Sequence, residues 1–131
     1  MTAPEQLARY RMSRARDALS EADALVNTAH FIGAQNRLYY AAFYAARALL
    51  ALKRLDSSRH SGVIALFQQH FVGTNAVDAD VARVLPRAFA QRLDSDYGDF
   101  STVTEDDVKA LRADVVTFLD VCERALSQIN A

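Results

Sequence analysis

Four residues in the middle of this chain could bind a nucleotide or a single-stranded nucleic acid. Their spacings of three, four and three would place all of them on one face of a helix: Arg37, Tyr40, Tyr44 and Arg47. Tyrosine rings stack on bases and guanidinium groups hold phosphate, and Arg37 and Tyr40 are the stronger candidates for these roles. Alternatively, the tyrosines pack against neighbouring helices while the arginines reach water at the rim.

Arg92 is a second candidate because the residues around it at helical spacing are apolar. It follows Leu85 and Phe89 and therefore extends an apolar seam. A guanidinium in such a place must be paired or face a cleft, since an unpaired buried charge is costly. Asp96, four residues later, is an available partner on the same face. The sequence leaves open whether Arg92 forms a structural ion pair or binds phosphate.

Tyr97 and His60 complete the candidate set. For Tyr97 we favour packing with the hydroxyl on a carbonyl, and hydrogen bonding to a ligand phosphate or base is the alternative. His60 stands where a helix should begin, and a histidine there usually caps or packs. His30, His60 and His70 lack the spacing of metal ligands, so we expect no metal site and no cofactor.

The elements that must position these residues are helices. Alanine is abundant, the chain has only four glycines and two prolines, and no segment alternates like a strand. Capping and periodicity predict helices over 4–28, 31–54, 60–71, 79–96 (kinked or restarted at Pro86) and 104 to the end. We therefore predict a single all-α domain over residues 1–131. It should be an up-and-down bundle of about five helices, a four-helix bundle plus a shorter helix, with 31–54 at its centre.

Charge is unevenly distributed along the chain, although the formal net charge is only −1. Residues 30–60 carry five basic residues against Asp56, whereas residues 92–107 carry six acidic residues against Arg92. This pattern excludes a broad basic surface for duplexes but permits a local basic groove for phosphate. The single cysteine, Cys122, indicates a reducing compartment, and no apolar run is long enough to cross a membrane, so we expect a cytoplasmic protein.

Three stretches together resemble a known family of helical domains. The stretch 36–50, with the sequence NRLYYAAFYAARALL, looks like the second helix of HEPN domains. The stretch 60–64, HSGVI, resembles the start of the third helix, and the stretch 92–97, RLDSDY, resembles the end of the fourth in the subgroup catalogued as an uncharacterised protein family. The likeness extends over residues 30 to 105, and the predicted helix order agrees with it.

The resemblance implies a homodimer in which the fourth-helix regions of two copies face each other and form a cleft. It also implies a partner, a minimal nucleotidyltransferase, in a toxin–antitoxin pair. Active members of the family cut RNA without metal, using an arginine followed by four to six residues and then a histidine. The arginine stabilises the charge on the phosphorane, and the histidine moves protons at the 2′-hydroxyl and the leaving oxygen.

This sequence departs from that motif at the histidine. Counting from Arg92 with four intervening residues leads to Tyr97, and no histidine follows His70. With a pKa of about 10, tyrosine is a poor general base at neutral pH. Arg54 and His60 have the required spacing, but they lie after the second predicted helix, so we regard this match as accidental.

Three functional hypotheses follow from the resemblance and the residues. The first is binding of RNA or a nucleotide in a dimer cleft, within a toxin–antitoxin-type module that includes a nucleotidyltransferase; the binding residues would be Arg37, Tyr40, Arg92, Asp96 and Tyr97. The second is a metal-free endoribonuclease toxin, in which Arg92 stabilises phosphate and His60 or Tyr97 handles protons. The third is a non-catalytic protein that only interacts with its partner.

Overall fold

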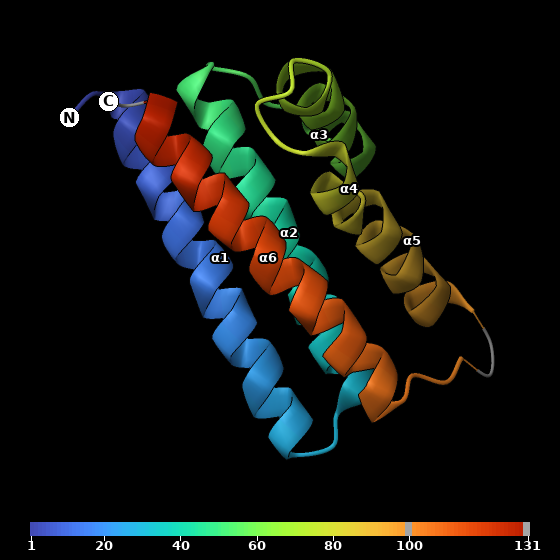
Figure 1. Ribbon diagram of the computed structural model, residues 1–131. Coiled ribbons are helices and arrows are strands. Elements are labelled where there is room, and N and C mark those ends of the chain that lie inside the picture. Colours follow the sequence, from blue (N-terminus) through green and yellow to red (C-terminus); the bar gives the residue numbers. More distant parts are fainter. Residues whose placement is uncertain (99–100, 130–131) are drawn as a thin grey trace.

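The computed structural model describes residues 1–98 and 101–129, which form an all-α bundle (Figure 1). Three long helices run alongside one another: α1 (Ala3–Asn27), α2 (Phe31–Leu52) and α6 (Glu105–Ile129). Three shorter helices connect α2 to α6: α3 (His60–Phe67), α4 (Ala79–Ala82) and α5 (Val84–Tyr97). The predicted fold class is confirmed. Asp99, one of the acidic residues counted above, lies outside the described residues.

Helices α1 and α6 begin at side chains that cap them. Thr2 Oγ1 accepts a hydrogen bond from the Glu5 amide at 3.3 Å at the start of α1. At the start of α6, the Thr104 amide donates to Asp107 Oδ2 at 3.0 Å and the Asp107 amide donates to Thr104 Oγ1 at 3.2 Å. These side chains satisfy amides that a helix start would otherwise leave without a partner. The Thr104 and Asp107 pair forms the reciprocal capping arrangement expected from the sequence.

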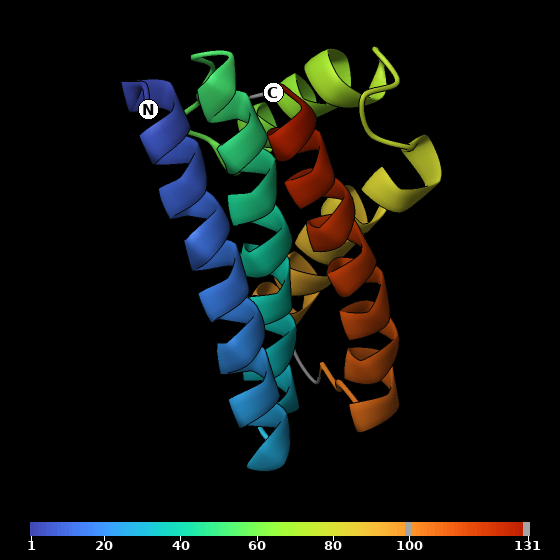
Figure 2. The same ribbon diagram turned by 60° about the vertical axis from the view of Figure 1, so that its left-hand side comes forward.

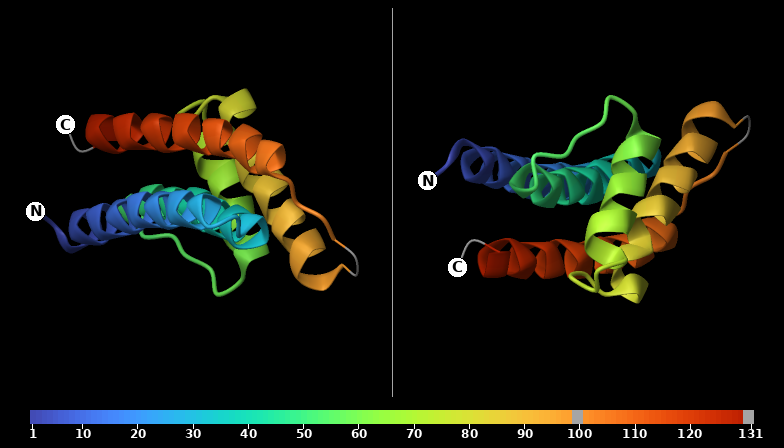
Figure 3. Two further views of the ribbon diagram at one scale, coloured as in Figure 1. Left: turned by 90° about the horizontal axis from the view of Figure 1, so that it is seen from below. Right: turned by 90° about the horizontal axis from the view of Figure 1, so that it is seen from above.

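Helix α2 is the most enclosed element, as predicted from its nearly continuous apolar sequence. Tyr39 is fully buried, and α2 is lined with buried alanines on several faces. Buried alanines on α1 face the same core, so α1 and α2 can approach closely and form the most extensive helix pair. Figures 2 and 3 show α1 beside α2, with α6 packed on one side of this pair and α3 and α5 lying at an angle to it.

Two segments differ in detail from the prediction. The helix expected over 79–96 is divided, because α4 ends at Ala82 and α5 starts at Val84. Pro86 lies in the first turn of α5, where the missing N–H removes no intrahelical hydrogen bond, so Pro86 restarts the helix and does not kink it. The helix expected over 60–71 changes at Gln68 into a π-helical turn, Gln68–Val72.

None of the helices in the described part of the chain is long and apolar enough to cross a membrane.

Candidate functional site

The centre of the candidate site is a pair formed by Tyr39 of α2 and His60, the first residue of α3. The Tyr39 hydroxyl oxygen lies 2.6 Å from His60 Nδ1. The His60 ring stacks on Phe43 with 4.4 Å between ring centroids and an interplanar angle of 16°. Phe89 of α5 lies on the same cluster, 6.1 Å from the His60 ring. Rings from three helices therefore fix the orientation of His60.

The environment keeps both members of this pair neutral at pH 7. Burial raises the pKa of the Tyr39 hydroxyl well above its usual range. Burial also lowers the pKa of His60, and the positive charges of Arg92 and Arg47 lower it further. Among the described residues, Nδ1 of His60 is the acceptor within reach of the buried Tyr39 proton. Tyr39 therefore donates to Nδ1, and the His60 ring carries its own proton on Nε2.

Arg92 of α5 lies on the same cluster of rings. Its guanidinium carbon is 5.5 Å from the centroid of the Tyr39 ring and 5.3 Å from that of Tyr40. Its Nε lies 3.2 Å from Asp96 Oδ2, so the expected ion pair is present, although the buried Nε–H is not aligned for a hydrogen bond. Within residues 1–98 and 101–129, Asp96 is the ion-pair partner of this guanidinium, and the two terminal nitrogens donate no hydrogen bond. They could donate to an external anion.

The arginine and tyrosine stripe of α2 continues this cluster. The Arg37 guanidinium carbon lies 4.7 Å from the Tyr40 ring, and the Tyr40 and Tyr44 rings are 6.1 Å apart. Arg14 of α1 lies 5.2 Å from the Tyr44 ring. We call this cluster of rings and flanking cations the α2 aromatic face; Tyr39 and Phe43 are buried beneath it, and its partly exposed residues are Tyr40, Tyr44, His60, Arg14, Arg37 and Arg92. The tyrosines pack as the structural alternative predicts, with Arg14 and Arg37 over their rings, and the binding role of this face stays a prediction.

Tyr97 does not belong to this face within one chain. It is 79% exposed at the end of α5, so the packing role favoured from the sequence is wrong for the isolated protomer. Five residues of helix rotate the chain by about 500°, which turns Tyr97 about 140° away from Arg92. The structure thus brings together Arg37, Tyr40, Arg92, Asp96 and His60, and it leaves Tyr97 pointing elsewhere.

Sequence reasoning missed Tyr39 and Phe43 as parts of the site. Both lie in the apolar run of α2 and therefore look like ordinary core residues. The only available signal was that Tyr39, Phe43 and His60 all fall within the stretches that resemble HEPN helices. The contact of Tyr39 with His60 spans 21 residues of chain, and helical periodicity says nothing about contacts of that range.

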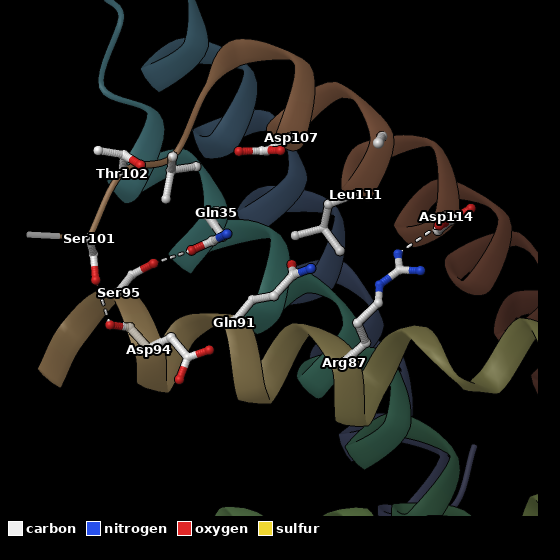
Figure 4. Close-up of a pocket in the computed structure, with 12 residues that line it drawn as sticks. Gln35, Arg87, Gln91, Asp94, Ser95, Ser101, Thr102, Asp107, Leu111 and Asp114 are labelled. Atoms are coloured by element: carbon white, nitrogen blue, oxygen red, sulfur yellow. Dashed lines mark hydrogen bonds and ion pairs between the residues drawn. The ribbon is translucent and has the colours of Figure 1, made fainter. Parts of the chain in front are cut away.

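Apart from the α2 aromatic face, a cavity of about 500 Å³ lies between α5, the start of α6 and Gln35 of α2 (Figure 4). Gln35 Oε1 accepts a hydrogen bond from Ser95 at 2.5 Å, and Arg87 is paired with Asp114 at 2.6 Å. Asp94 and Asp107 also line it, so carboxylates outnumber cations in this lining. The cavity is therefore unsuited to a phosphate group, in contrast to the α2 aromatic face.

In the part of the chain that the structure describes, no three side chains among histidine, cysteine, aspartate and glutamate lie close enough together to hold a metal ion.

Comparisons with known proteins identify the family. The sequence model of the HEPN domain matches residues 8–125. A UPF0332 protein of Thermotoga maritima is 36% identical over 130 residues, which cover 99% of this chain and 98% of that protein. A UPF0332 protein of Gloeobacter violaceus is 35% identical over 118 residues, covering 89% of this chain and 94% of that protein. A Methanocaldococcus jannaschii protein named "putative toxin" is 30% identical over 115 residues, covering 88% of this chain and 85% of that protein. The chain therefore belongs to the HEPN domain family.

Proposed function

We propose that this chain is a toxin-like HEPN protein that binds single-stranded RNA or a nucleotide on its α2 aromatic face. The observation that carries the proposal is the position of Arg92. Its guanidinium lies over Tyr39 and Tyr40 and is paired with Asp96, but its two terminal nitrogens donate no hydrogen bond to the described residues. A cation with open donors beside aromatic rings provides the two contacts that a nucleotide needs, one for phosphate and one for the base.

Tyr40 is the ring best placed to stack on a base. It is only partly buried, and the guanidinium carbons of Arg37 and Arg92 lie 4.7 Å and 5.3 Å from its centroid. Stacking on an aromatic side chain is worth about 1–3 kcal/mol per base and tolerates different sequences. The two arginines supply phosphate contacts at either side. We therefore expect binding with little sequence preference and with a strong dependence on salt.

The proposal includes a homodimer in which the ends of α5 from two copies face each other. The exposed Tyr97 supports it, because an aromatic ring that is 79% exposed at a helix end is available for burial by a partner. In such a dimer, Tyr97 would reach the cleft near Arg92 and Asp96 through the assembly. A second protein, a minimal nucleotidyltransferase, would complete a toxin–antitoxin-type module. The toxin name of two relatives supports the toxin half of this module, and the nucleotidyltransferase half rests on the resemblance to the family.

Cleavage of RNA is the second candidate function, favoured by the placement of His60. Tyr39 touches both His60 and Arg92, so a phosphate held by Arg92 would lie near a histidine. The resting tautomer opposes this role, because a ring that carries its proton on Nε2 offers a donor there and no base. His60 would then stabilise a phosphate oxygen. Binding without turnover is the function that the geometry favours.

The test is a binding titration with a labelled single-stranded oligoribonucleotide and with AMP at fixed salt. Arg92→Ala should weaken both by roughly ten- to hundredfold, since charge-assisted hydrogen bonds contribute about 1.5–3 kcal/mol. The matched control is Arg83→Ala, because Arg83 is 77% exposed and paired with Asp80 away from the α2 aromatic face. Unchanged affinity in Arg92→Ala would refute the site.

Incubation of the same RNA with the chain in EDTA separates binding from cleavage. We expect intact RNA after prolonged incubation. Products that disappear in both Arg92→Ala and His60→Asn would instead establish the metal-free ribonuclease. Co-expression with a candidate nucleotidyltransferase, followed by purification on a tag of one protein, tests the partner. A chain that binds the partner but neither RNA nor AMP would support the third hypothesis, a protein-interaction role alone.

A further inference from the structure

A cavity with a net positive lining, distinct from the one beside Gln35, includes His60 among its lining residues. It has a volume of about 540 Å³ and lies between the α2–α3 loop and the middle of α2; its lining residues include Arg47, Asp56, Ser57, Ser58, Arg59 and His60. We propose that this cavity is a second phosphate subsite, so that the ligand is a strand with at least two phosphates. This inference rests on the proposed function and deepens it by distinguishing a strand from a mononucleotide.

One anionic group of the chain itself lines the cavity, the carboxylate of Asp56. Arg47 Nη2 donates to Asp56 Oδ2 at 3.0 Å, and Arg11 Nη2 donates to the same oxygen at 3.3 Å. The Ser57 amide donates to Oδ1 at 2.8 Å. Two guanidinium groups and a backbone amide thus converge on a pair of oxygens, which is also the way proteins bind phosphate. Asp56 shows that this point of the fold attracts an anion.

Positive charge remains after Asp56 is counted. Arg47 and Arg59 are the two guanidinium groups of the lining, and Arg11, outside the lining, shares the Asp56 carboxylate with Arg47. The Nε of Arg47 is buried and has no hydrogen-bond partner in the described part of the chain. Burial and the charge of Arg47 lower the pKa of Arg11, which reflects two cations held close together. A further anion would relieve this excess.

The loop that forms the cavity wall packs tightly on the start of α3. Gly62 lies so close to Ser57 that an added Cβ would collide with the Ser57 hydroxyl oxygen. Ser57 Oγ accepts a hydrogen bond from the Arg59 amide at 3.2 Å, which fixes the turn. No side chain caps the start of α3, so its first amides contribute partial positive charge on this side. The wall is therefore a built structure with two hydroxyls and a cation.

His60 connects the cavity to the Arg92 end of the site. It lines the cavity, and its pKa is lowered first by burial and then by the charges of Arg92 and Arg47. Tyr40, which contacts Arg92, and Arg47 are seven residues apart on α2, about 10 Å along the helix axis. When one phosphate of a strand is bound at Arg92, the cavity is still available for another phosphate of the same strand. Asp56 would compete with that second phosphate.

The experiment compares a labelled hexauridylate with AMP over a range of salt concentrations. Arg59→Gln should weaken hexauridylate binding about five- to tenfold and reduce the salt slope by about 0.7, the value for one lost contact to a single strand. Its affinity for AMP should change less than twofold. Asp56→Asn should strengthen hexauridylate binding at least threefold without a matching gain for AMP. Arg83→Gln serves as the charge-matched control.

The outcomes separate the subsite from the proposed function. If the unaltered chain binds neither hexauridylate nor AMP, the proposed function and the phosphate subsite are both wrong. Suppose that it binds both probes. If Arg59→Gln then leaves the salt dependence of hexauridylate binding unchanged, or weakens AMP binding as much as hexauridylate binding, only the subsite is wrong. Asp56→Asn removes the carboxylate that Arg11 and Arg47 share, so its helical content must be checked by circular dichroism. Arg59 is exposed and is not subject to this concern, so the Arg59→Gln result decides the matter.

Discussion

At the scale of single residues, the most consequential contact is the one between Tyr39 and His60. A buried hydroxyl and a ring nitrogen satisfy each other, and the ring is clamped by Phe43. The arrangement specifies a neutral histidine whose Nε2 carries the proton. His60 can therefore donate a hydrogen bond to an anion. Arg92, which also contacts Tyr39, is a donor to anions as well. Two consequences can be measured separately.

The pKa of His60 should lie below 6.5, because burial and the charges of Arg92 and Arg47 disfavour the protonated ring. Between the folded-state pKa and about 6.5, the unfolded chain binds more protons than the folded chain. The contribution of a neutral His60 to stability is therefore complete above pH 6.5 or so and is lost as the pH falls below that value. Histidine NMR titration measures both the pKa and the tautomer. A pKa equal to or above that of the same residue in urea would contradict the argument.

Removal of the Tyr39 hydroxyl tests the hydrogen bond itself. Tyr39→Phe should reduce the free energy of unfolding by about 1–3 kcal/mol, because it leaves Nδ1 of His60 without its buried partner. Tyr40→Phe is the control, since the Tyr40 hydroxyl makes no hydrogen bond to the residues that the structure describes, and it should cost less than about 0.5 kcal/mol. Urea denaturation gives both values. Equal losses in the two variants would show that the hydroxyl of Tyr39 has no special role.

At the scale of elements, helix α1 ends in a strained backbone conformation. Ala29 has a φ of 59°, in the left-handed region that glycine adopts more easily. The amide of His30 donates to the Leu25 carbonyl at 2.8 Å and that of Ala29 to the Val26 carbonyl at 3.0 Å, which closes the helix. This turn sets the geometry between α1 and α2, and alanine is not the residue that suits it best.

Ala29→Gly should therefore raise the free energy of unfolding by about 0.5–1 kcal/mol, since it relieves the cost of a Cβ at positive φ. Ala24→Gly is the matched control: Ala24 is exposed in the last turn of α1 and has no positive φ, so glycine there should lower stability by up to about 1 kcal/mol. Thermal or urea unfolding should show that the free energy of unfolding rises in Ala29→Gly and falls in Ala24→Gly. Two losses of similar size would mean that the strain at Ala29 is relieved in some other way.

The elements could be predicted from the sequence because their signals are local. Thr2, Asp78 and Thr104 each cap a helix within two residues of a predicted helix start, and Pro86 lies in the first turn of α5. The site could be predicted only in part. Arg37 and Tyr40 share a helix face, which spacing reveals, whereas His60 reaches Tyr39 across a loop and Arg92 arrives from α5. Such contacts depend on how helices pack, and no local pattern encodes them.

At the scale of the whole molecule, the exposed ring at the end of α5 remains without a role in one chain. Tyr97 is 79% exposed, whereas Tyr39, in the aromatic cluster of α2, is fully buried. A large aromatic ring gains about 1.5–3 kcal/mol when it leaves water. In the proposed symmetric dimer each substitution acts twice, once in each copy. The assembly state is therefore a sensitive measure of whether this ring is buried by a second copy.

We expect the unaltered chain to sediment as a dimer at tens of micromolar and Tyr97→Arg to dissociate it, with a dimer dissociation constant raised at least about a hundredfold. Tyr10→Arg is the control, because Tyr10 is also an exposed tyrosine, 59% accessible, but lies on α1. If the dimer forms and both variants leave it intact, the cleft lies elsewhere on the molecule. If the unaltered chain is a monomer, Tyr97 cannot approach Arg92 and the α2 aromatic face must bind its ligand within one chain. Measurement of hexauridylate affinity on the same samples then decides whether assembly is needed for binding, since loss of the dimer and loss of affinity should coincide in Tyr97→Arg alone.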